Sequence, residues 1–266
     1  MKMINVIKAQ KYQLLRSIST YVILLCSLLF IAAILFAEIS GEQAEKITGS
    51  MFVSYIGEIN MTILPILILV YTAVIFGNDL TDKTVNYELL CGIRRSDVFF
   101  GRFFVVLAVN IIVYLIITVP PMLIFTALNG WGHTMTVKEV AIRYSLGLLP
   151  VIRYTSFYTF ITMAVRNKAV VIGIGYVFSM ITMLLTILIN ELFDTKVTMY
   201  LFSIDIFDRL LNPKNMGYGF FDGEDVMVVK DILETDTMCH AAAASILGTA
   251  VFLLIGYAVM RRRDMN

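Results

Sequence analysis

The chain has 266 residues, of which 59% are hydrophobic and 15% are charged, and its mean hydropathy is +0.82. A soluble domain does not need so many apolar residues, so this composition excludes an ordinary globular protein and predicts an integral membrane protein of the all-α class. The formal net charge is +1. The basic residues form no stripe of the kind that binds nucleic acid, so no nucleic-acid partner is expected.

Six apolar stretches are long enough to cross the hydrocarbon as helices, which takes about 20 residues each. They cover about 19–37, 59–77, 103–128, 140–165, 169–190 and 241–260. The first stretch is not followed by a small-residue cleavage site and a soluble mature chain, so it is predicted to be a retained helix and not a signal peptide. Residues 1–266 are therefore predicted to form one transmembrane domain.

The distribution of Lys and Arg predicts the orientation, because positive residues near the ends of membrane helices stay in the cytoplasm. One side of the predicted spans carries 13 Lys and Arg residues and the other side carries 6. The richer side comprises 1–16, 78–102, 166–168 and 261–266. Both termini are therefore expected to be cytoplasmic, with the long segment 191–240 outside the cell.

The N-terminal segment 1–18 places Ile4, Ile7, Leu14 and Ile18 at helical spacing. An amphipathic helix of this kind can lie along the membrane surface, with the stem of Lys11 buried and its charge in water. The alternative is that these residues are only the charged beginning of the first span.

The cytoplasmic segment 78–101 contains a second amphipathic pattern. Val85, Leu89 and Ile93 recur at intervals of four residues, which predicts one apolar face of a short helix. Gly92 is a typical helix stop, and the pair Ser96 and Asp97 is a typical start for a helix that continues into the third span. This surface is predicted to bind a soluble partner, and the alternative is a helix that rests on lipid headgroups.

These residues resemble a motif of the ABC-2 family of bacterial ABC transporter permeases. The matching positions are Asp79, Lys83, Thr84, Asn86, Leu89, Leu90, Gly92, Ile93, Arg95, Phe99, Phe100 and Arg102. The resemblance extends to six spans, a long outer segment before the last span and a basic end at 261–263. The family often has Glu, Gly and Ser where this chain has Asp79, Lys83 and Arg94, which leaves the subfamily open.

The resemblance implies a transmembrane subunit in a bacterial cytoplasmic membrane. It would pair with a second permease subunit, the same or homologous, and with two ATPase subunits that bind ATP and Mg. The segment 78–101 would be a coupling helix that contacts the ATPase through Asp79, Thr84, Val85, Leu89, Ile93 and Arg95. The chain has no GxxxxGK[ST] phosphate loop, so it is not expected to be an enzyme or to bind a cofactor itself.

Two rows of polar residues lie inside predicted spans. Asn110 and Tyr114 share one face of the third span with Thr118, and the fifth span has a face made of Gly175, Ser179, Thr182 and Thr186. Small and hydroxyl residues usually allow close helix packing, but they can also line a hydrated pathway. The resemblance adds that the fifth helix meets its counterpart at the dimer seam.

Arg153 lies near the middle of the fourth span, where a charge costs about 2.5–3.5 kcal/mol or more. Its side chain must therefore face protein or water. Glu58 is a candidate partner for a structural ion pair. The alternative is that Arg153 contacts an acidic group of a substrate.

The transported substrate is expected to be hydrophobic or amphipathic, such as an antimicrobial or secreted peptide, by analogy with the family. The alternative function is an ion-coupled secondary transporter or a channel without an ATPase, which should show internal repeats and acids in the middle of spans. The cysteines, Cys26, Cys91 and Cys239, lie at three predicted depths, so they predict no disulfide and no metal site.

Overall fold

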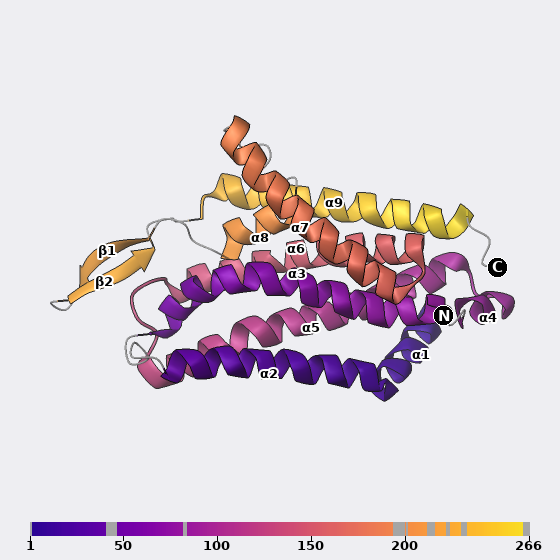
Figure 1. The fold of residues 1–266 in the computed structure, drawn as a ribbon, viewed down its shortest axis with the longest axis horizontal. Coiled ribbons are helices and arrows are strands. Elements are labelled where there is room, and N and C mark those ends of the chain that lie inside the picture. Colours follow the sequence, from indigo (N-terminus) through magenta and orange to yellow (C-terminus); the bar gives the residue numbers. More distant parts are fainter. Residues whose placement is uncertain are drawn as a thin grey trace.

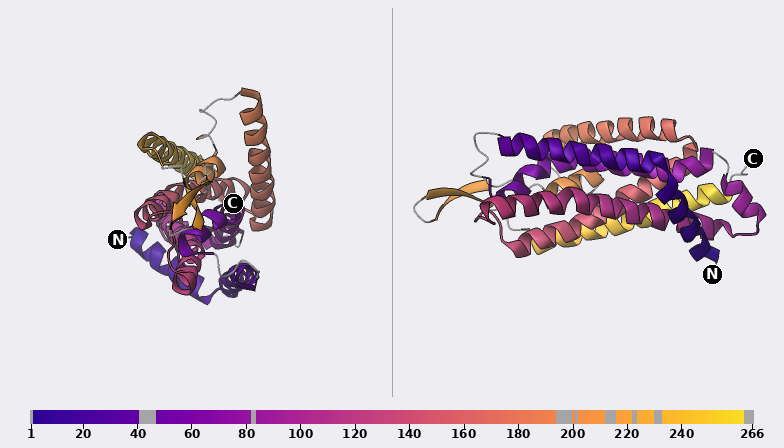
Figure 2. Two further views of the ribbon diagram at one scale, coloured as in Figure 1. Left: turned by 90° about the vertical axis from the view of Figure 1, so that its left-hand side faces the viewer. Right: turned by 90° about the horizontal axis from the view of Figure 1, so that it is seen from below.

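A computed structural model describes residues 2–40, 47–81, 84–193, 200, 202–211, 216–221, 224–229 and 233–262. Over these residues the chain forms nine α-helices and one β-hairpin. The long helices run side by side along the length of the molecule (Figure 1). The helix α1, the short helix α4 and the end of α9 lie at one end of this bundle, and the hairpin projects from the other end (Figure 2).

Each of the six predicted apolar stretches falls largely within one long helix. These helices are α2 (Ile18–Ser40), α3 (Gly49–Thr81), α5 (Arg95–Asn129), α6 (Val137–Val165), α7 (Lys168–Phe193) and α9 (Thr235–Arg262). Within the described residues, α5, α6 and α9 are long and apolar enough to cross a membrane, and the bent pair α1–α2 is a fourth candidate. The apolar parts Ile63–Asn78 and Lys168–Thr182 are shorter. The composition and these helices together indicate a membrane protein.

Two short helices occupy the cytoplasmic side of the predicted topology. The helix α1 (Lys2–Arg16) is followed by the single non-helical residue Ser17 and meets α2 at a bend of 65°. The helix α4 (Thr84–Leu90) is followed by a turn and then by α5, which continues without a break through Phe99 into the third predicted span. The cap residue of α5 is Arg94 and not Ser96, because Arg94 is extended and its carbonyl accepts from the Val98 amide at 3.2 Å.

The segment 191–240, which is predicted to lie outside the cell, is not entirely helical in the part that the structure describes. It contains one short helix, α8 (Ser203–Leu211), and two antiparallel strands, β1 (Met216–Phe221) and β2 (Glu224–Val229). The strands pair from Met216 with Val229 to Phe221 with Glu224. Aromatic and β-branched residues favour strands, and the sequence between them, Asp222 and Gly223, is typical of a tight hairpin. The strands at 216–221 and 224–229 are thus an exception within an otherwise helical chain.

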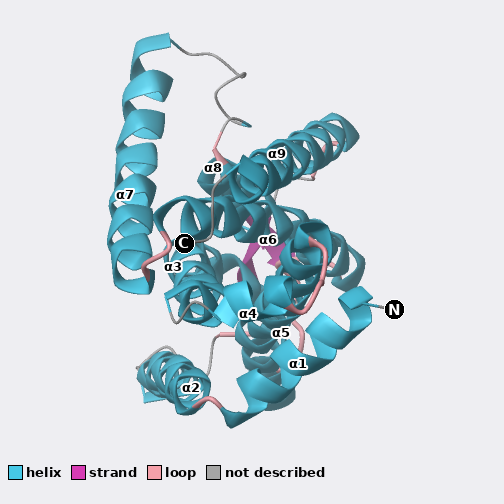
Figure 3. Cartoon of the chain, turned by 90° about the vertical axis from the view of Figure 1, so that its right-hand side faces the viewer, coloured by secondary structure: helices cyan, strands magenta, loops and turns pink. Residues whose placement is uncertain are grey.

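The core of the bundle lies where α3, α5 and α6 meet. Its fully buried side chains include Leu64, Ile68, Phe99, Val106, Tyr114, Val151 and Tyr158. The helices α2 and α7 lie at the periphery on either side of α3 (Figure 3). Both carry many exposed large apolar residues, among them Leu25 and Leu29 of α2 and Val177 and Leu184 of α7. Exposed apolar surface of this extent suits contact with lipid or with another membrane subunit.

Close packing of α5 on α6 depends on Gly147, where a Cβ atom would collide with the Tyr114 hydroxyl. We expect Gly147→Ala to destabilise the chain by about 1–3 kcal/mol, which is typical of overpacking. Thermal unfolding in detergent measures the effect. Adding Tyr114→Phe should restore part of the loss by removing the colliding oxygen. Gly173→Ala is the matched control, because nothing lies within 4 Å of a Cβ there; a loss as large at Gly173 would contradict the prediction.

Candidate functional site

The segment with the family-like motif forms the tip of the bundle at the cytoplasmic side of the predicted topology (Figure 1). The helix α4 has only seven residues. It ends where Gly92 adopts a positive φ of 76°, and the amides of Cys91, Gly92 and Ile93 donate to the carbonyls of the last turn. This geometry is a glycine C-cap, as the sequence predicts. The chain then turns back directly into α5.

The apolar stripe of α4 faces its own bundle. Val85 is 2% exposed, and Leu89 is half-buried against the main core, as is Ile93, which lies beyond the end of α4. The face that points away from the bundle carries Tyr87, which is 69% exposed, and Leu90, which is 83% exposed. Among the large apolar residues that the structure describes, Leu90 has the highest exposed fraction. The surface available to a partner is thus Tyr87 and Leu90, whereas the stripe anchors α4.

A buried ion pair fixes the orientation of α4. Arg102 of α5 donates to a carboxylate oxygen of Glu88 at 2.9 Å, and its side chain is only 2% exposed. Because an arginine in this position cannot be hydrated by bulk water, the pair is expected to hold α4 and the first turns of α5 together. The sequence carries no local signal for this pair, since Glu88 and Arg102 are 14 residues apart and lie on different helices.

Arg95 links the tip to the end of the last helix. Its guanidinium donates to the carbonyl of Met260 at 3.1 Å and to that of Arg261 at 2.8 Å. A cation at these orphan carbonyls completes the C-terminus of α9. Thr84 begins α4, and the side chain of Asp79 lies outside the part of the chain that the structure describes. Arg95, which is one of the predicted coupling residues, therefore bonds to the last turn of α9 in the same chain.

The polar row of α5 is buried at the centre of the bundle. The amide nitrogen of Asn110 donates to the hydroxyl oxygens of Thr72 on α3 and Thr155 on α6, both at 3.0 Å. The Tyr114 hydroxyl donates to the carbonyl of Tyr144 at 2.9 Å, and Thr118 bonds within its own helix. All three side chains of the row are 0% exposed. This geometry favours the interpretation as a packing seam between three helices.

The small-residue face of α7 also packs within the chain. A Cβ at Gly175 would collide with Leu69 of α3, and the hydroxyls of Ser179 and Tyr158 share a hydrogen bond of 2.9 Å. Thr182 is 6% exposed and donates to the Ser179 carbonyl. The side chain of Thr186 lies outside the described residues. This face therefore attaches α7 to α3 and α6, and the opposite face of α7 is exposed.

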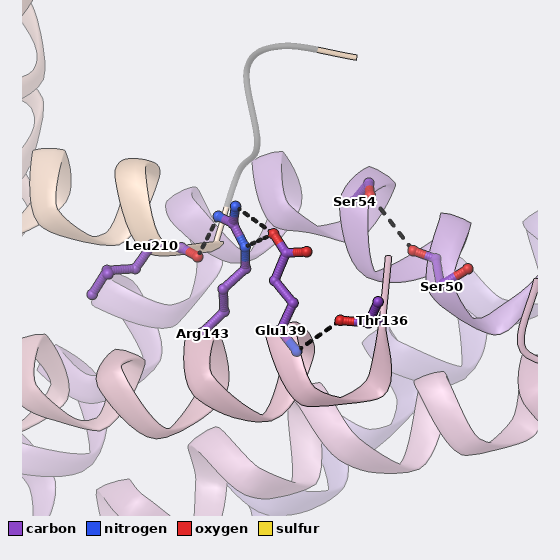
Figure 4. Close-up of polar contacts among 6 residues, drawn as sticks. All are labelled: Ser50, Ser54, Thr136, Glu139, Arg143 and Leu210. Atoms are coloured by element: carbon purple, nitrogen blue, oxygen red, sulfur yellow. Dashed lines mark hydrogen bonds and ion pairs between the residues drawn. The ribbon is translucent and has the colours of Figure 1, made fainter. Parts of the chain in front are cut away.

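Two buried arginines of α6 hold the outer helix α8. Arg143 is 1% exposed; it donates to the Leu210 carbonyl at 3.2 Å and pairs with Glu139 one turn away at 3.0 Å (Figure 4). The cap of α6 lies nearby, where the Glu139 amide donates to the Thr136 hydroxyl. The apolar face of α8 is buried against α3 and α6 through Ile204, Ile206, Phe207, Leu210 and Leu211.

Arg153 lies ten residues further along α6, about 15 Å from Arg143. Its guanidinium donates to the carbonyl of Tyr200 at 3.2 Å and interacts electrostatically with Asp205 in the first turn of α8. Arg153 and Asp205 are each 8% exposed. Gly248 of α9 also lies against the Arg153 guanidinium. Any larger residue at position 248 would place its Cβ in collision with the Arg153 side chain. The acid beside Arg153 is thus Asp205, and the side chain of Glu58 lies outside the described residues.

The chain matches no protein-family model and no curated protein sequence. Within the described residues, no group of three or more His, Cys, Asp or Glu side chains could hold a metal ion. What the geometry defines is a helical membrane bundle with a short helix fixed at each end, α4 by Arg102 and α8 by Arg143 and Arg153.

Removing Arg153 should destabilise the chain by stranding the carboxylate of Asp205. We expect Arg153→Met to cost about 1–3 kcal/mol, because it removes the donor to the Tyr200 carbonyl and the cation beside the buried carboxylate of Asp205. Arg153→Met combined with Asp205→Asn should regain most of this loss. Thermal unfolding in detergent and the yield of folded protein measure both effects. Rescue by Glu58→Gln instead of Asp205→Asn would show that the assigned partner is wrong.

Proposed function

We propose that the chain is the transmembrane subunit of an ATP-driven exporter of the ABC-2 kind. It has six membrane spans and cytoplasmic termini, and it assembles with a second permease subunit and two separate ATPase subunits in a bacterial cytoplasmic membrane. The ATPase subunits bind ATP and Mg and supply the energy. The substrate is hydrophobic or amphipathic, with a secreted or antimicrobial peptide as the leading candidate class.

The lengths of the helices support six spans. The helix α2 has 23 residues and is about 35 Å long, which exceeds the hydrocarbon thickness of about 30 Å. The helices α3 and α7 have 33 and 26 residues. The end of the bundle that carries α1 and α4 is also rich in Lys and Arg, including Lys8, Lys11, Arg94 and Arg262. Positive residues of this kind mark the cytoplasmic side.

The observation that carries the proposal is the fixed tip. The helix α4 is held by the pair of Glu88 with Arg102, and it presents Tyr87 and Leu90 beyond the bundle. An exposed tyrosine is suited to anchor a protein partner, and the exposed leucine beside it adds apolar area that a contact would bury. Arg95 bonds the start of α5 to the end of α9, so a force on the tip reaches two long helices.

The second permease subunit is proposed to contact the side of the bundle formed by α2, α3 and α7. On this side α2 and α7 flank α3 (Figure 3), and their outward surfaces are apolar. A hydrophobic or amphipathic substrate would be compatible with a path along the same surfaces. The resemblance to the family supports this placement, since the first and fifth spans of its members meet at the dimer seam.

A charge at the exposed tip should separate the chain from its ATPase. Leu90→Asp places a carboxylate where an apolar contact excludes water, and interface anchors typically carry 2 kcal/mol or more, which is over tenfold in affinity. We expect loss of co-purification with the ATPase and loss of export, with normal insertion and stability. The measurement is affinity purification from membranes together with a transport assay.

Val137→Asp is the matched control, because Val137 is 63% exposed at the opposite end of the bundle and should retain the ATPase. Leu89→Asp is a poorer test, since Leu89 packs on the core and its loss would destabilise the subunit itself. Wild-type ATPase association and export in Leu90→Asp would contradict the coupling assignment.

The native cysteines test the topology, because Cys91 lies at the tip, Cys239 lies near the other end of the bundle and both are exposed. In a chain that retains only Cys239, a membrane-impermeant thiol reagent added to intact cells should label the protein. In a chain that retains only Cys91, labelling should require permeabilised cells. Labelling of Cys91 in intact cells would exclude the proposed orientation.

A further inference from the structure

The helix α1 is attached to the bundle by one face only. Val6 is 2% exposed and packs against Gly101 of α5, where a Cβ would come within 3.0 Å of it. Gln10, one turn further on, is 4% exposed. Both lie on the face toward α5, so this face is occupied within the chain and the opposite face is open.

The open face combines cations with large apolar side chains. Ile4, Tyr12 and Leu15 are 53%, 58% and 53% exposed, and Lys8 and Lys11 are exposed between them on the same side of the helix. The guanidinium of Arg16 lies 4.5 Å from the centre of the Tyr12 ring. No Asp or Glu occurs in the first 37 residues of the chain. All charged residues of this face are therefore basic, and α1 contains no acid that could neutralise them.

The bend places this face at the membrane surface. The angle of 65° between α1 and α2 means that α1 lies close to the membrane plane when α2 crosses near the normal. The exposed residues of α1 continue directly into the exposed apolar surface of α2, which begins with Ile18 and Tyr21. A helix in this position has its lysines at the level of the lipid phosphates and its apolar side chains at the acyl boundary.

We propose that the open face of α1 binds the headgroups of anionic phospholipids, with Lys8 and Lys11 contacting phosphate and Ile4 and Leu15 entering the acyl region. The placement in the cytoplasmic leaflet rests on the topology of the proposed function. Charge complementarity and continuity with the lipid-facing surface of α2 favour lipid over a protein partner. A protein partner has a separate surface at the tip, made of Tyr87 and Leu90.

The test reconstitutes the purified chain in vesicles made of equal parts phosphatidylcholine and phosphatidylglycerol. After gentle extraction, mass spectrometry measures the ratio of the two lipids that remain bound. We expect the wild type to enrich phosphatidylglycerol, and Lys8→Gln with Lys11→Gln to lower the enrichment by roughly fivefold per lysine, the factor that corresponds to about 1 kcal/mol near an anionic surface. High salt should lower the wild-type enrichment as well.

Lys138→Gln is the matched control, because Lys138 is exposed at the other end of the bundle and should leave the ratio unchanged. Equal enrichment in the wild type and the double variant would overturn the proposal, as would an equal loss in the control. Loss of ATPase association with unchanged lipid enrichment would identify a protein partner instead and overturn it too. The lipid measurement needs no ATPase, so failure of the exporter assignment would leave this result readable on its own.

Discussion

The fold depends on the requirement that two arginines in one apolar helix stay out of contact with lipid. Arg143 and Arg153 both project from α6, and a charge in hydrocarbon is costly whichever scale is used. α6 therefore occupies the inside of the bundle, where it packs against α3, α5, α7 and α9. The same two side chains supply the contacts for α8, through the Leu210 carbonyl and through Asp205. The helix α8 is thus attached to α6 by Arg143 and Arg153, two buried cations that required polar partners in any case.

A comparable arrangement orders the other end. Arg102 lies where α5 passes from the bundle into the tip, and its side chain is buried there. Glu88 of α4 supplies the negative charge that balances the Arg102 guanidinium. Arg95 completes the end of α9. The tip is therefore bonded to two long helices, α5 through Arg102 and α9 through Arg95. The exposed pair of Tyr87 and Leu90 follows from the same constraint, since burying one face of a seven-residue helix leaves the other face outside.

Sequence patterns predicted local features, such as helices and their apolar faces, better than they predicted which surface each face packs against. The spacing of Val85, Leu89 and Ile93 predicted a short helix with one apolar face; α4 has that face at Val85 and Leu89, whereas Ile93 follows the end of the helix. Periodicity shows that one face of a helix will be buried, but it does not show which surface will cover that face. The stripe was expected to contact an ATPase subunit, whereas in the structure it packs on the core of its own chain. Likewise, the spacing of Gly175 and Ser179 could not identify their neighbours, which in the structure are Leu69 and Tyr158 of the same chain.

The sequence by itself determined the class of protein, the positions of the long helices and the glycine stop at Gly92, because hydrophobicity, length and glycine conformation are local properties. It also required Arg153 to have a partner. Only the tertiary structure decided that Asp205 is the acid beside it, that Glu88 compensates Arg102 and that residues 216–221 pair with residues 224–229. These pairings join residues between 14 and 52 positions apart or depend on strand register, and the packing of whole helices, which no local pattern encodes, brings them together.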